Sequence, residues 1–341
     1  MHTEYLSADP AGIRRAGELL RAGGLVGIPT ETVYGLAANA FDGAAVAKIF
    51  AAKGRPMDNP LIVHISETDQ IHALVANFPP RAQRLAAAYW PGPLTIILHK
   101  SGRIPDEVSA GLPTVAVRFP QHPVARAIID AAGCPLAAPS GNRSGKPSPT
   151  CAAHMRADMD GRIDAILDGG DCGVGVESTV ITLADDRPRL LRPGGITLSQ
   201  LCAVLGDVDV DPAVTHRLAD GQAAASPGMK YKHYAPNADV SLVRGTTQQF
   251  ADYVNAHAAP GTYAMCFDED VPLLRVPYRS YGASADGLAQ AHRLFDCLRE
   301  FDRIGARRVY AHCPQQDGVG LAVYNRMIRA AGFSVISASD S

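Results

Sequence analysis

Short apolar runs alternate with amphipathic segments from about residue 24 to residue 206. Four of the amphipathic segments repeat apolar residues at intervals of three and four, which is the spacing of a helix face, at 13–24, 44–54, 79–90 and 122–133. Eight apolar runs have the length and composition of strands, at 24–30, 61–65, 94–100, 114–119, 135–140, 164–170, 178–183 and 189–194. Strands that alternate with helices predict an α/β domain built on a mixed, largely buried sheet.

The pattern changes after Gly206. Residues 207–239 show no sustained periodicity and contain several prolines, so we predict a linker there. Further along, strand-like runs and two helical segments predict a small Rossmann-like α/β domain, with strands at 240–245, 262–267, 308–313 and 333–338 and helices at 288–305 and 321–332. The predicted division is a first domain at 1–206, a linker at 207–239 and a second domain at 240–341.

Composition and charge exclude several classes of protein. The 341 residues are 47% apolar and 19% charged, as in ordinary globular proteins, and 32 basic residues balance 34 acidic ones. This balance argues against a bulk nucleic-acid binder, so any polyanion must be bound locally. The chain has no long apolar run and its start lacks the order of a signal peptide, so we expect a cytoplasmic protein with no membrane association. Its seven cysteines are not spaced like the ligands of a zinc site.

Familiar nucleotide-binding signatures are incomplete. The segment 141–148 resembles a P-loop, but it has one residue too few between its glycines and Pro147 where Ser or Thr should bind magnesium. The segments 173–178 and 318–323 each lack the third glycine of a dinucleotide fingerprint. A nucleotide must therefore be bound by residues outside these known signatures.

Polar residues gather where predicted strands and helices of the first domain end. Lys53 and Arg55 lie two residues apart in a turn rich in Gly and Pro, which can direct both cations at one point. Ser140 and Asn142 follow a strand in a Gly- and Ser-rich loop, and Arg118 ends another strand. Ligands of open α/β sheets bind at such strand ends, and paired cations near such a loop are suited to polyphosphate.

Each of these residues also has a structural interpretation. Lys53 or Arg55 could be a solvated charge at a helix C-terminus, and the polar residues of the 138–148 loop could be turn formers. His64 lies in an apolar run, where a buried structural histidine is the commoner case. Arg118 follows a buried strand and needs an anionic partner, which is either internal or a ligand.

Seven segments, taken together and in order, resemble the Sua5 family of threonylcarbamoyl-AMP synthases. They are IPTETVYGL at 28–36, KIFAAKGRPMDNPL at 48–61, YWPGPLT at 89–95, APSGNRSG at 138–145, ESTVI at 177–181, LRPGGI at 191–196 and SPGMKYKHYAP at 226–236. The resemblance spans nearly the whole chain. It implies a YrdC-like catalytic domain with an open twisted mixed sheet, followed by a linker and a C-terminal Sua5 domain.

The resemblance implies that the chain makes L-threonylcarbamoyladenylate and pyrophosphate from L-threonine, bicarbonate and ATP. Mg²⁺ is expected with the ATP phosphates and without dedicated protein ligands. The product would pass to the tRNA threonylcarbamoyl transferase complex, which makes N6-threonylcarbamoyladenosine, and a weak contact with tRNA is a further expectation. Two alternatives remain open, namely an RNA-binding module and an enzyme that transfers a carbamoyl group to another acceptor.

The resemblance also assigns roles to residues of this sequence. The catalytic group that holds the ATP phosphates would be Lys53, Arg55, Ser140 and Asn142. Further contacts to ATP would come from Asn59, Thr114, Ser148, Arg192 and Tyr234. Threonine would contact Thr32, His64, Arg118 and Ser178, with a backbone contact near Ala138, where some relatives carry a hydroxyl residue. The linker would fold over the site as a lid, which would exclude water from hydrolytically fragile intermediates.

Overall fold

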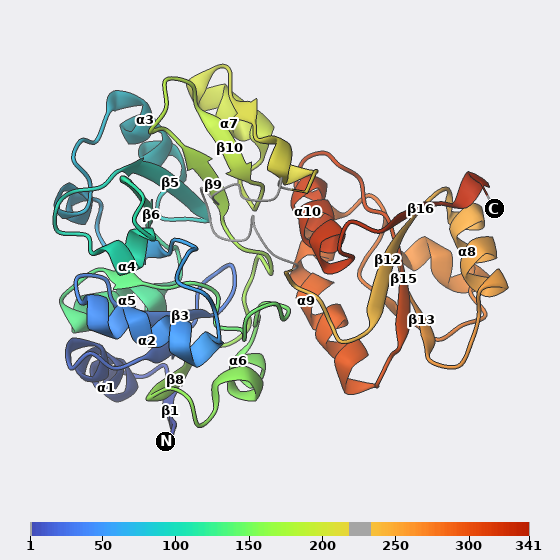
Figure 1. The fold of residues 1–341 in the computed structure, drawn as a ribbon, viewed down its shortest axis with the longest axis horizontal. Helices are drawn as coiled ribbons and strands as arrows, with labels where there is room; N and C mark the ends of the chain where they lie inside the picture. Colours follow the sequence, from blue (N-terminus) through green and yellow to red (C-terminus); the bar gives the residue numbers. More distant parts are fainter. Residues whose placement is uncertain (1, 218–232, 341) are drawn as a thin grey trace. The chain divides into compact units, whose positions relative to one another are not determined.

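The computed structural model describes residues 2–217 and 233–340, which form two compact units (Figure 1). Among the described residues, unit 1 comprises 2–144 and 148–214, and unit 2 comprises 145–147, 215–217 and 233–340. Three residues from the middle of the first predicted domain therefore group with unit 2. Each unit has its own sheet and is described separately below.

Unit 1 is built on an open sheet of eleven strands. Parallel pairs such as β4 with β6 alternate with antiparallel pairs such as β5 with β6, so the predicted mixed sheet is confirmed. In spatial order the strands are β1 (Glu4–Ser7), β8 (Ala165–Asp168), β2 (Val26–Ile28), β3 (Gly35–Asn39), β7 (Leu136–Ala137), β4 (Ile62–His64), β6 (Thr114–Arg118), β5 (Leu94–His99), β9 (Thr179–Thr182), β10 (Arg189–Arg192) and β11 (Asp209–Val210).

The helices of unit 1 begin at residues suited to helix starts. Asp9 and Asp42 accept hydrogen bonds from backbone N–H groups at the starts of the first two helices, and proline occupies the first turn of three helices. The α-helices are α1 (Pro10–Arg21), α2 (Gly43–Lys53), α3 (Pro80–Tyr89), α4 (Asp106–Ser109), α5 (Pro123–Ala132), α6 (Ala152–Met159) and α7 (Leu198–Leu205), with short 3₁₀ helices η1 (Thr68–Ala73) and η2 (Pro212–Val214).

One face of the unit 1 sheet is divided into two halves. Over β8, β2, β3 and β7, residues of α1 and α5 pack on the strands and form an apolar core that includes Leu20 and Ile128. Over β4, β6, β5, β9 and β10, the same face carries a small apolar cluster that includes Ala116, and Ala213 of η2 packs there. This second half combines apolar residues with the polar residues described in the next subsection.

The segment predicted to be a linker begins with regular structure. β11 (Asp209–Val210) pairs in parallel with β10, and η2 follows it directly. Unit 1 therefore extends to Val214, beyond the predicted end at Gly206. Two residues of strand carry too little periodicity to be recognised in a sequence. The middle of the predicted linker, 218–232, lies outside the described residues.

Unit 2 is a parallel five-stranded sheet in the order β14, β13, β15, β12, β16. One helix covers one face, and the other two α-helices cover the opposite face (Figure 1). The elements are β12 (Asp239–Arg244), α8 (Thr247–Ala256), β13 (Thr262–Cys266), η3 (Asp268–Leu273), β14 (Tyr278–Ser280), α9 (Gly287–Arg303), β15 (Arg308–His312), α10 (Gly320–Ala330), β16 (Val335–Ser337) and η4 (Ala338–Asp340). The predicted small α/β domain is confirmed.

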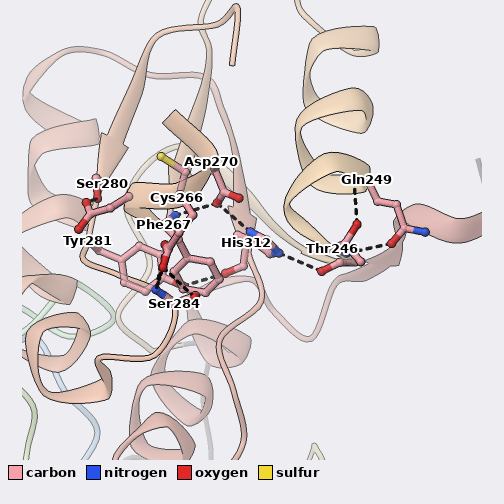
Figure 2. Close-up of polar contacts among 12 residues, drawn as sticks. Thr246, Gln249, Cys266, Phe267, Asp270, Ser280, Tyr281, Ser284 and His312 are labelled. Atoms are coloured by element: carbon pink, nitrogen blue, oxygen red, sulfur yellow. Dashed lines mark hydrogen bonds and ion pairs between the residues drawn. The ribbon is translucent and has the colours of Figure 1, made fainter. Parts of the chain in front are cut away.

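A buried histidine connects three parts of unit 2 (Figure 2). His312 Nδ1 lies 2.8 Å from Asp270 Oδ2, and His312 Nε2 lies 3.1 Å from the carbonyl oxygen of Gly245. Its ring stacks on Phe250 with 4.4 Å between ring centroids. Because both ring nitrogens contact protein acceptors, we interpret His312 as a structural residue that links β15, η3 and the start of α8.

No helix within residues 2–217 and 233–340 combines the length and the apolar character that a bilayer crossing requires.

The contact between α1 and α5 depends on a glycine inside a helix. A Cβ atom at Gly17 would lie 2.6 Å from the backbone carbonyl carbon of Ala131. We therefore expect Gly17→Ala to lower the free energy of unfolding by about 1–3 kcal/mol through overpacking, against the roughly 1 kcal/mol that alanine adds to helix propensity. Urea unfolding measures the change. Gly102→Ala is the control, because a Cβ there meets open space and the effect should be near zero.

Candidate functional site

The end of α2 separates the two predicted phosphate-binding cations. Gly54 follows α2 with φ 62°, a left-handed conformation that glycine adopts readily, and this turn ends the helix between Lys53 and Arg55. Lys53 is only 3% exposed, and its Nζ donates to the carbonyl oxygens of Ser140 and Asn142. Arg55 is half-buried, and its Nη2 donates to the carbonyl oxygen of Asn59 at 3.2 Å. The two cations therefore have different surroundings.

Lys53 fixes the loop after β7. Burial, and secondarily the charge of Arg55, hold the pKa of Lys53 well below its usual value. An ammonium group has three N–H donors, and two of them contact loop carbonyls, which leaves one without a partner among the described residues. Lys53 can therefore shape the loop and still donate to a phosphate oxygen.

The loop itself is held by its own polar side chains. Ser140 Oγ donates to Asn142 Oδ1 at 2.6 Å, and Asn142 Nδ2 donates to the carbonyl oxygen of Arg143 at 2.8 Å. Ser148 is fully buried, and its hydroxyl donates to the carboxylate of Glu177. The structure thus brings together Lys53, Ser140 and Asn142, as the sequence predicted, and adds Glu177 beside Ser148.

The side chain of Asn59 is a buried amide without a protein partner among the described residues. It is 0% exposed, and neither its amide nitrogen nor its amide oxygen has a hydrogen-bond partner there. Buried amides almost always have partners, so an unpaired amide beside the Lys53–Arg55 turn indicates a group that binds there.

Strand register places further predicted residues on one face of the sheet. His64 is directly opposite Arg118 in the parallel β4–β6 pair, and Thr95 is opposite Arg118 in the antiparallel β5–β6 pair. Because side chains alternate along a strand, Thr114 shares the face of Arg118. Thr114 lies four residues from Arg118, which is about 13 Å along the strand. Asn59 precedes β4, so it belongs to the end of the sheet where Thr114 lies.

Arg118 is the central residue at the other end of this face. Its guanidinium donates from Nη1 to Thr32 Oγ1 at 2.8 Å and from Nε to the Gly92 carbonyl oxygen at 3.4 Å. Nη2 forms an ion pair with Glu31 Oε1 at 2.8 Å. The anionic partner that the sequence required is therefore internal in this structure, and it comes from the loop that also carries Thr32.

His64 is neutral beside this cation. It is 3% exposed, and its Nδ1 lies 3.2 Å from the carbonyl oxygen of Ile62. Burial and the neighbouring charge of Arg118 lower the pKa of His64 to about 3. A neutral imidazole can contact a substrate without adding a second positive charge to the site.

Ser178 and Arg192 are joined, although the resemblance assigns them to different substrates. Arg192 donates from Nη2 to Ser178 Oγ at 3.1 Å and from Nε to the Ser178 carbonyl oxygen at 3.0 Å. Ser178 Oγ also lies 2.8 Å from Thr95 Oγ1, and Thr95 is opposite Arg118. Arg192 therefore lies at the same end of the face as the predicted threonine residues.

Ala138 and Tyr234 complete the set of predicted residues that the structure describes. The N–H of Ala138 donates to the carbonyl oxygen of Ile62 at 2.9 Å, which leaves its carbonyl as the backbone group for a ligand. Tyr234 belongs to unit 2, is 5% exposed, has φ 65° and packs on Phe295 with 5.3 Å between ring centroids. Its contact with a nucleotide stays a prediction. Most of the predicted lid motif 226–236 lies outside the described residues.

Sequence reasoning missed three residues of this site. Glu31 is inside the IPTETVYGL motif, in which the resemblance assigns a binding role only to Thr32. Glu177 begins the ESTVI motif, and its contact with Ser148 spans 29 positions of sequence. Thr95 ends the YWPGPLT motif, but only strand register shows that it lies opposite Arg118.

Two cavities contain none of the predicted site residues. One, of about 530 Å³, lies between the ends of α1 and α2 and is lined by Lys48, Arg162 and Asp164 among others. The other, of about 280 Å³, lies in unit 2 between the starts of α9 and α10. Among the described residues, no cluster of three or more His, Cys, Asp or Glu side chains is arranged to hold a metal ion.

The buried, neutral His64 predicts a pH dependence of stability. Its pKa is about 3 in the folded chain and near 6.5 in an unfolded one, so the unfolded state binds more protons between these values. The free energy of unfolding should fall on acidification from pH 6.5, by up to about 1.4 kcal/mol per pH unit. His64→Asn removes this contribution, so its urea-derived stability should decline less steeply between pH 7 and pH 4.5. Parallel curves for the two proteins would contradict this prediction.

Comparisons with known proteins agree with the arrangement of these residues. Residues 18–194 match a family model of Sua5, YciO and YrdC proteins described as telomere recombination, and residues 196–332 match the model described as threonylcarbamoyl-AMP synthase, C-terminal domain. The chain is 45% identical over 338 residues to the threonylcarbamoyl-AMP synthase of Bacillus subtilis, which is 98% of this chain and 97% of that protein.

Archaeal relatives give the same result in sequence and structure. The threonylcarbamoyl-AMP synthase of Pyrococcus abyssi is 44% identical over 330 residues, which is 95% of each chain. The crystal structure of P. abyssi Sua5 complexed with L-threonine has a TM-score of 0.91 at 41% identity and covers 99% of each chain. By full-length identity, by both family models and by fold, the chain belongs to the Sua5 family of threonylcarbamoyl-AMP synthases.

Proposed function

We propose that this chain is an L-threonylcarbamoyladenylate synthase. It joins L-threonine, bicarbonate and ATP into threonylcarbamoyl-AMP and releases pyrophosphate, and a tRNA-modifying complex uses the product to make N6-threonylcarbamoyladenosine. The observation that carries the proposal is one sheet face with Arg118 at one end and the unpaired amide of Asn59, beside the Lys53–Arg55 turn, at the other. Family membership supports the same reaction.

The Arg118 end of the face fits threonine. A guanidinium binds a carboxylate through paired donors, and the surrounding hydroxyl groups of Thr32 and Ser178 can contact the side chain of the amino acid. A site that hydrogen-bonds the threonine hydroxyl rejects analogues that lack it. The P. abyssi relative crystallised with L-threonine supports this choice of substrate.

The opposite end fits the phosphates of ATP. Lys53 keeps one N–H for a phosphate oxygen, Arg55 is partly exposed in the adjacent turn, and the amide of Asn59 lacks a partner among the described residues. Thr114 and Arg118 are roughly 13 Å apart along β6, which separates the proposed phosphate and threonine positions. Arg192 lies at the threonine end, joined to Ser178, where it could contact the α-phosphate as this group meets the carboxylated threonine.

The reaction needs alignment and charge neutralisation more than a protein nucleophile. The neutral threonine amine is carboxylated, and an oxygen of the resulting N-carboxy group attacks the α-phosphorus of ATP. Lys53 and Arg55 neutralise charge on the departing pyrophosphate. Mg²⁺ would be held mainly by phosphate oxygens, because Mg²⁺ commonly binds nucleotides through their phosphates, and it would neutralise the same charge.

The purified chain should form threonylcarbamoyl-AMP when supplied with threonine, bicarbonate, ATP and Mg²⁺. Mass spectrometry detects the product directly, and pyrophosphate release should require both ATP and threonine. Release without the mixed anhydride would indicate a different acceptor. RNA binding without any turnover would instead favour a binding module.

We expect Arg55→Ala to lower kcat by about 10²-fold or more, because the charge that it loses acts on the leaving pyrophosphate. Arg55 lies over the ring of Phe50, 5.8 Å from its centroid. Arg103→Ala is the matched control, since Arg103 lies over the ring of Phe41, 4.4 Å from its centroid, in a different region of unit 1. Pyrophosphate release measures both variants, and the control should keep the original rate. Equal rates in the two variants would remove Arg55 from the phosphate site.

A further inference from the structure

The buried side chain of Arg118 forms an ion pair with one carboxylate, that of Glu31. The two side chains are 4% and 12% exposed, and 2.8 Å separates Nη2 of the arginine from Oε1 of the glutamate. Neither carboxylate oxygen of Glu31 accepts a hydrogen bond of ordinary geometry from a described residue. A buried carboxylate has acceptor capacity for several donors, so Glu31 can take a donor group from a ligand.

An α-amino acid carries a carboxylate and an ammonium group on the same carbon. The protein groups that bind these two charges must therefore lie next to each other and have opposite signs. Arg118 and Glu31 satisfy both conditions, and they are in direct contact. Arg118 alone would bind the carboxylate and leave the ammonium group in a buried site without a partner, which is costly.

The other polar side chains around Arg118 carry no negative charge. The hydroxyl of Thr32 contacts both Thr30 and Arg118, at 2.9 Å and 2.8 Å. Ser178 contacts Thr95 and Arg192. His64 is neutral and makes a backbone contact with its Nδ1. Glu31 is thus the anionic group of this end of the site.

We propose that Glu31 binds the α-ammonium group of threonine and accepts the proton that this group loses before carboxylation. The inference rests on the proposed threonylcarbamoyl-AMP synthase function and adds a residue to it. The family resemblance assigns this proton transfer to no side chain of the chain.

The chemistry balances with one proton acceptor. The ammonium form of threonine and bicarbonate give the N-carboxy anion, water and one proton. A nitrogen–carbon bond forms from the lone pair that deprotonation exposes, and a carbon–oxygen bond of bicarbonate breaks to release water. Glu31 takes the remaining proton and becomes a neutral carboxylic acid.

Substrate binding can itself switch on this proton transfer. Burial raises the pKa of Glu31, but the guanidinium of Arg118 and the nearby backbone N–H groups of Gln121 and Glu31 together keep the pKa below its ordinary value. A substrate carboxylate that binds Arg118 shares this positive charge. The pKa of Glu31 then rises, so Glu31 becomes a better proton acceptor when threonine is in place.

The titratable groups that face Glu31 come from several elements. Arg118 of β6 and His64 of β4 are described above. Glu31 also raises the pKa of His122, at the start of α5, against a lowering by burial. Burial raises the pKa of Cys172 to about 12, with Glu31 contributing. None of these groups is an anion near neutral pH, so Glu31 supplies the acceptor.

The binding test compares threonine with 2,3-dihydroxybutanoate, which replaces the ammonium group by a hydroxyl and keeps the carboxylate. Calorimetry on the full chain should show threonine binding at least about tenfold more tightly than the analogue, because only threonine pairs with Glu31. Glu31→Gln should abolish or reverse this preference. Glu67→Gln, at an exposed glutamate of unit 1, is the control and should leave it unchanged.

The kinetic test uses pH. Glu31→Gln should lower kcat by about 10²-fold or more at pH 7, the usual contribution of a general base. Its rate should then rise by about tenfold per pH unit above neutrality, as more threonine arrives with a neutral amine. Glu31→Asp should recover part of the loss, since it restores a carboxylate.

These measurements separate the inference from the function. Equal weakening of both ligands in Glu31→Gln, with a uniform loss of rate at every pH, would mean that Glu31 only holds Arg118 and would overturn the inference. An unchanged preference for threonine would overturn it as well. A wild-type chain that makes no threonylcarbamoyl-AMP would refute the proposed function, whereas the comparison of ligands would still report on Glu31.

Discussion

The buried guanidinium of Arg118 is the interaction around which unit 1 is organised. A charge this deep in a sheet is stable only if nearby groups compensate it, and here the compensation comes from Glu31 and Thr32 of the loop before β3. The requirement draws that loop over the centre of the sheet, beside His64 of β4. One electrostatic constraint therefore positions the site and keeps His64 neutral beside Arg118. It also places a cation and an anion next to each other, as a zwitterionic ligand requires.

The sheet face with the site combines two kinds of surface. Helices α1 and α5 cover one half and provide much of its packing, whereas the other half has an apolar centre with charged and amide groups toward its ends. Such a surface can hold a long, unsymmetrical ligand without enclosing it in a deep cavity. Lys53 supports this surface indirectly, because its ammonium group donates hydrogen bonds to the backbone of the loop that carries Ser140 and Asn142.

Periodicity predicted the central elements, because long or strongly apolar segments produce clear patterns. All eight strand-like runs of the first domain contain strands. β1, β3, β11 and β14 were not predicted, since they are short or lie in segments with mixed polarity. The helix α8 was not predicted either, because its sequence is largely polar. The residue-level site was predicted through family motifs, whereas Glu31 and Thr95 depend on long-range register and on charge compensation. These properties exist only once the chain has folded.

The two outer strands of the eleven-stranded sheet influence how the molecule behaves toward its own copies. An unpaired strand edge is a template for pairing with another chain, and long apolar edges promote aggregation. β11 consists of Asp209 and Val210 alone, and ion pairs of Arg187 with Asp209 and of Arg189 with Asp211 place charge along it. At the opposite edge, Arg15 pairs with Glu4 of β1. The short, charged segment after Gly206 thus gives a second copy of the chain little strand edge to pair with at this side of the sheet.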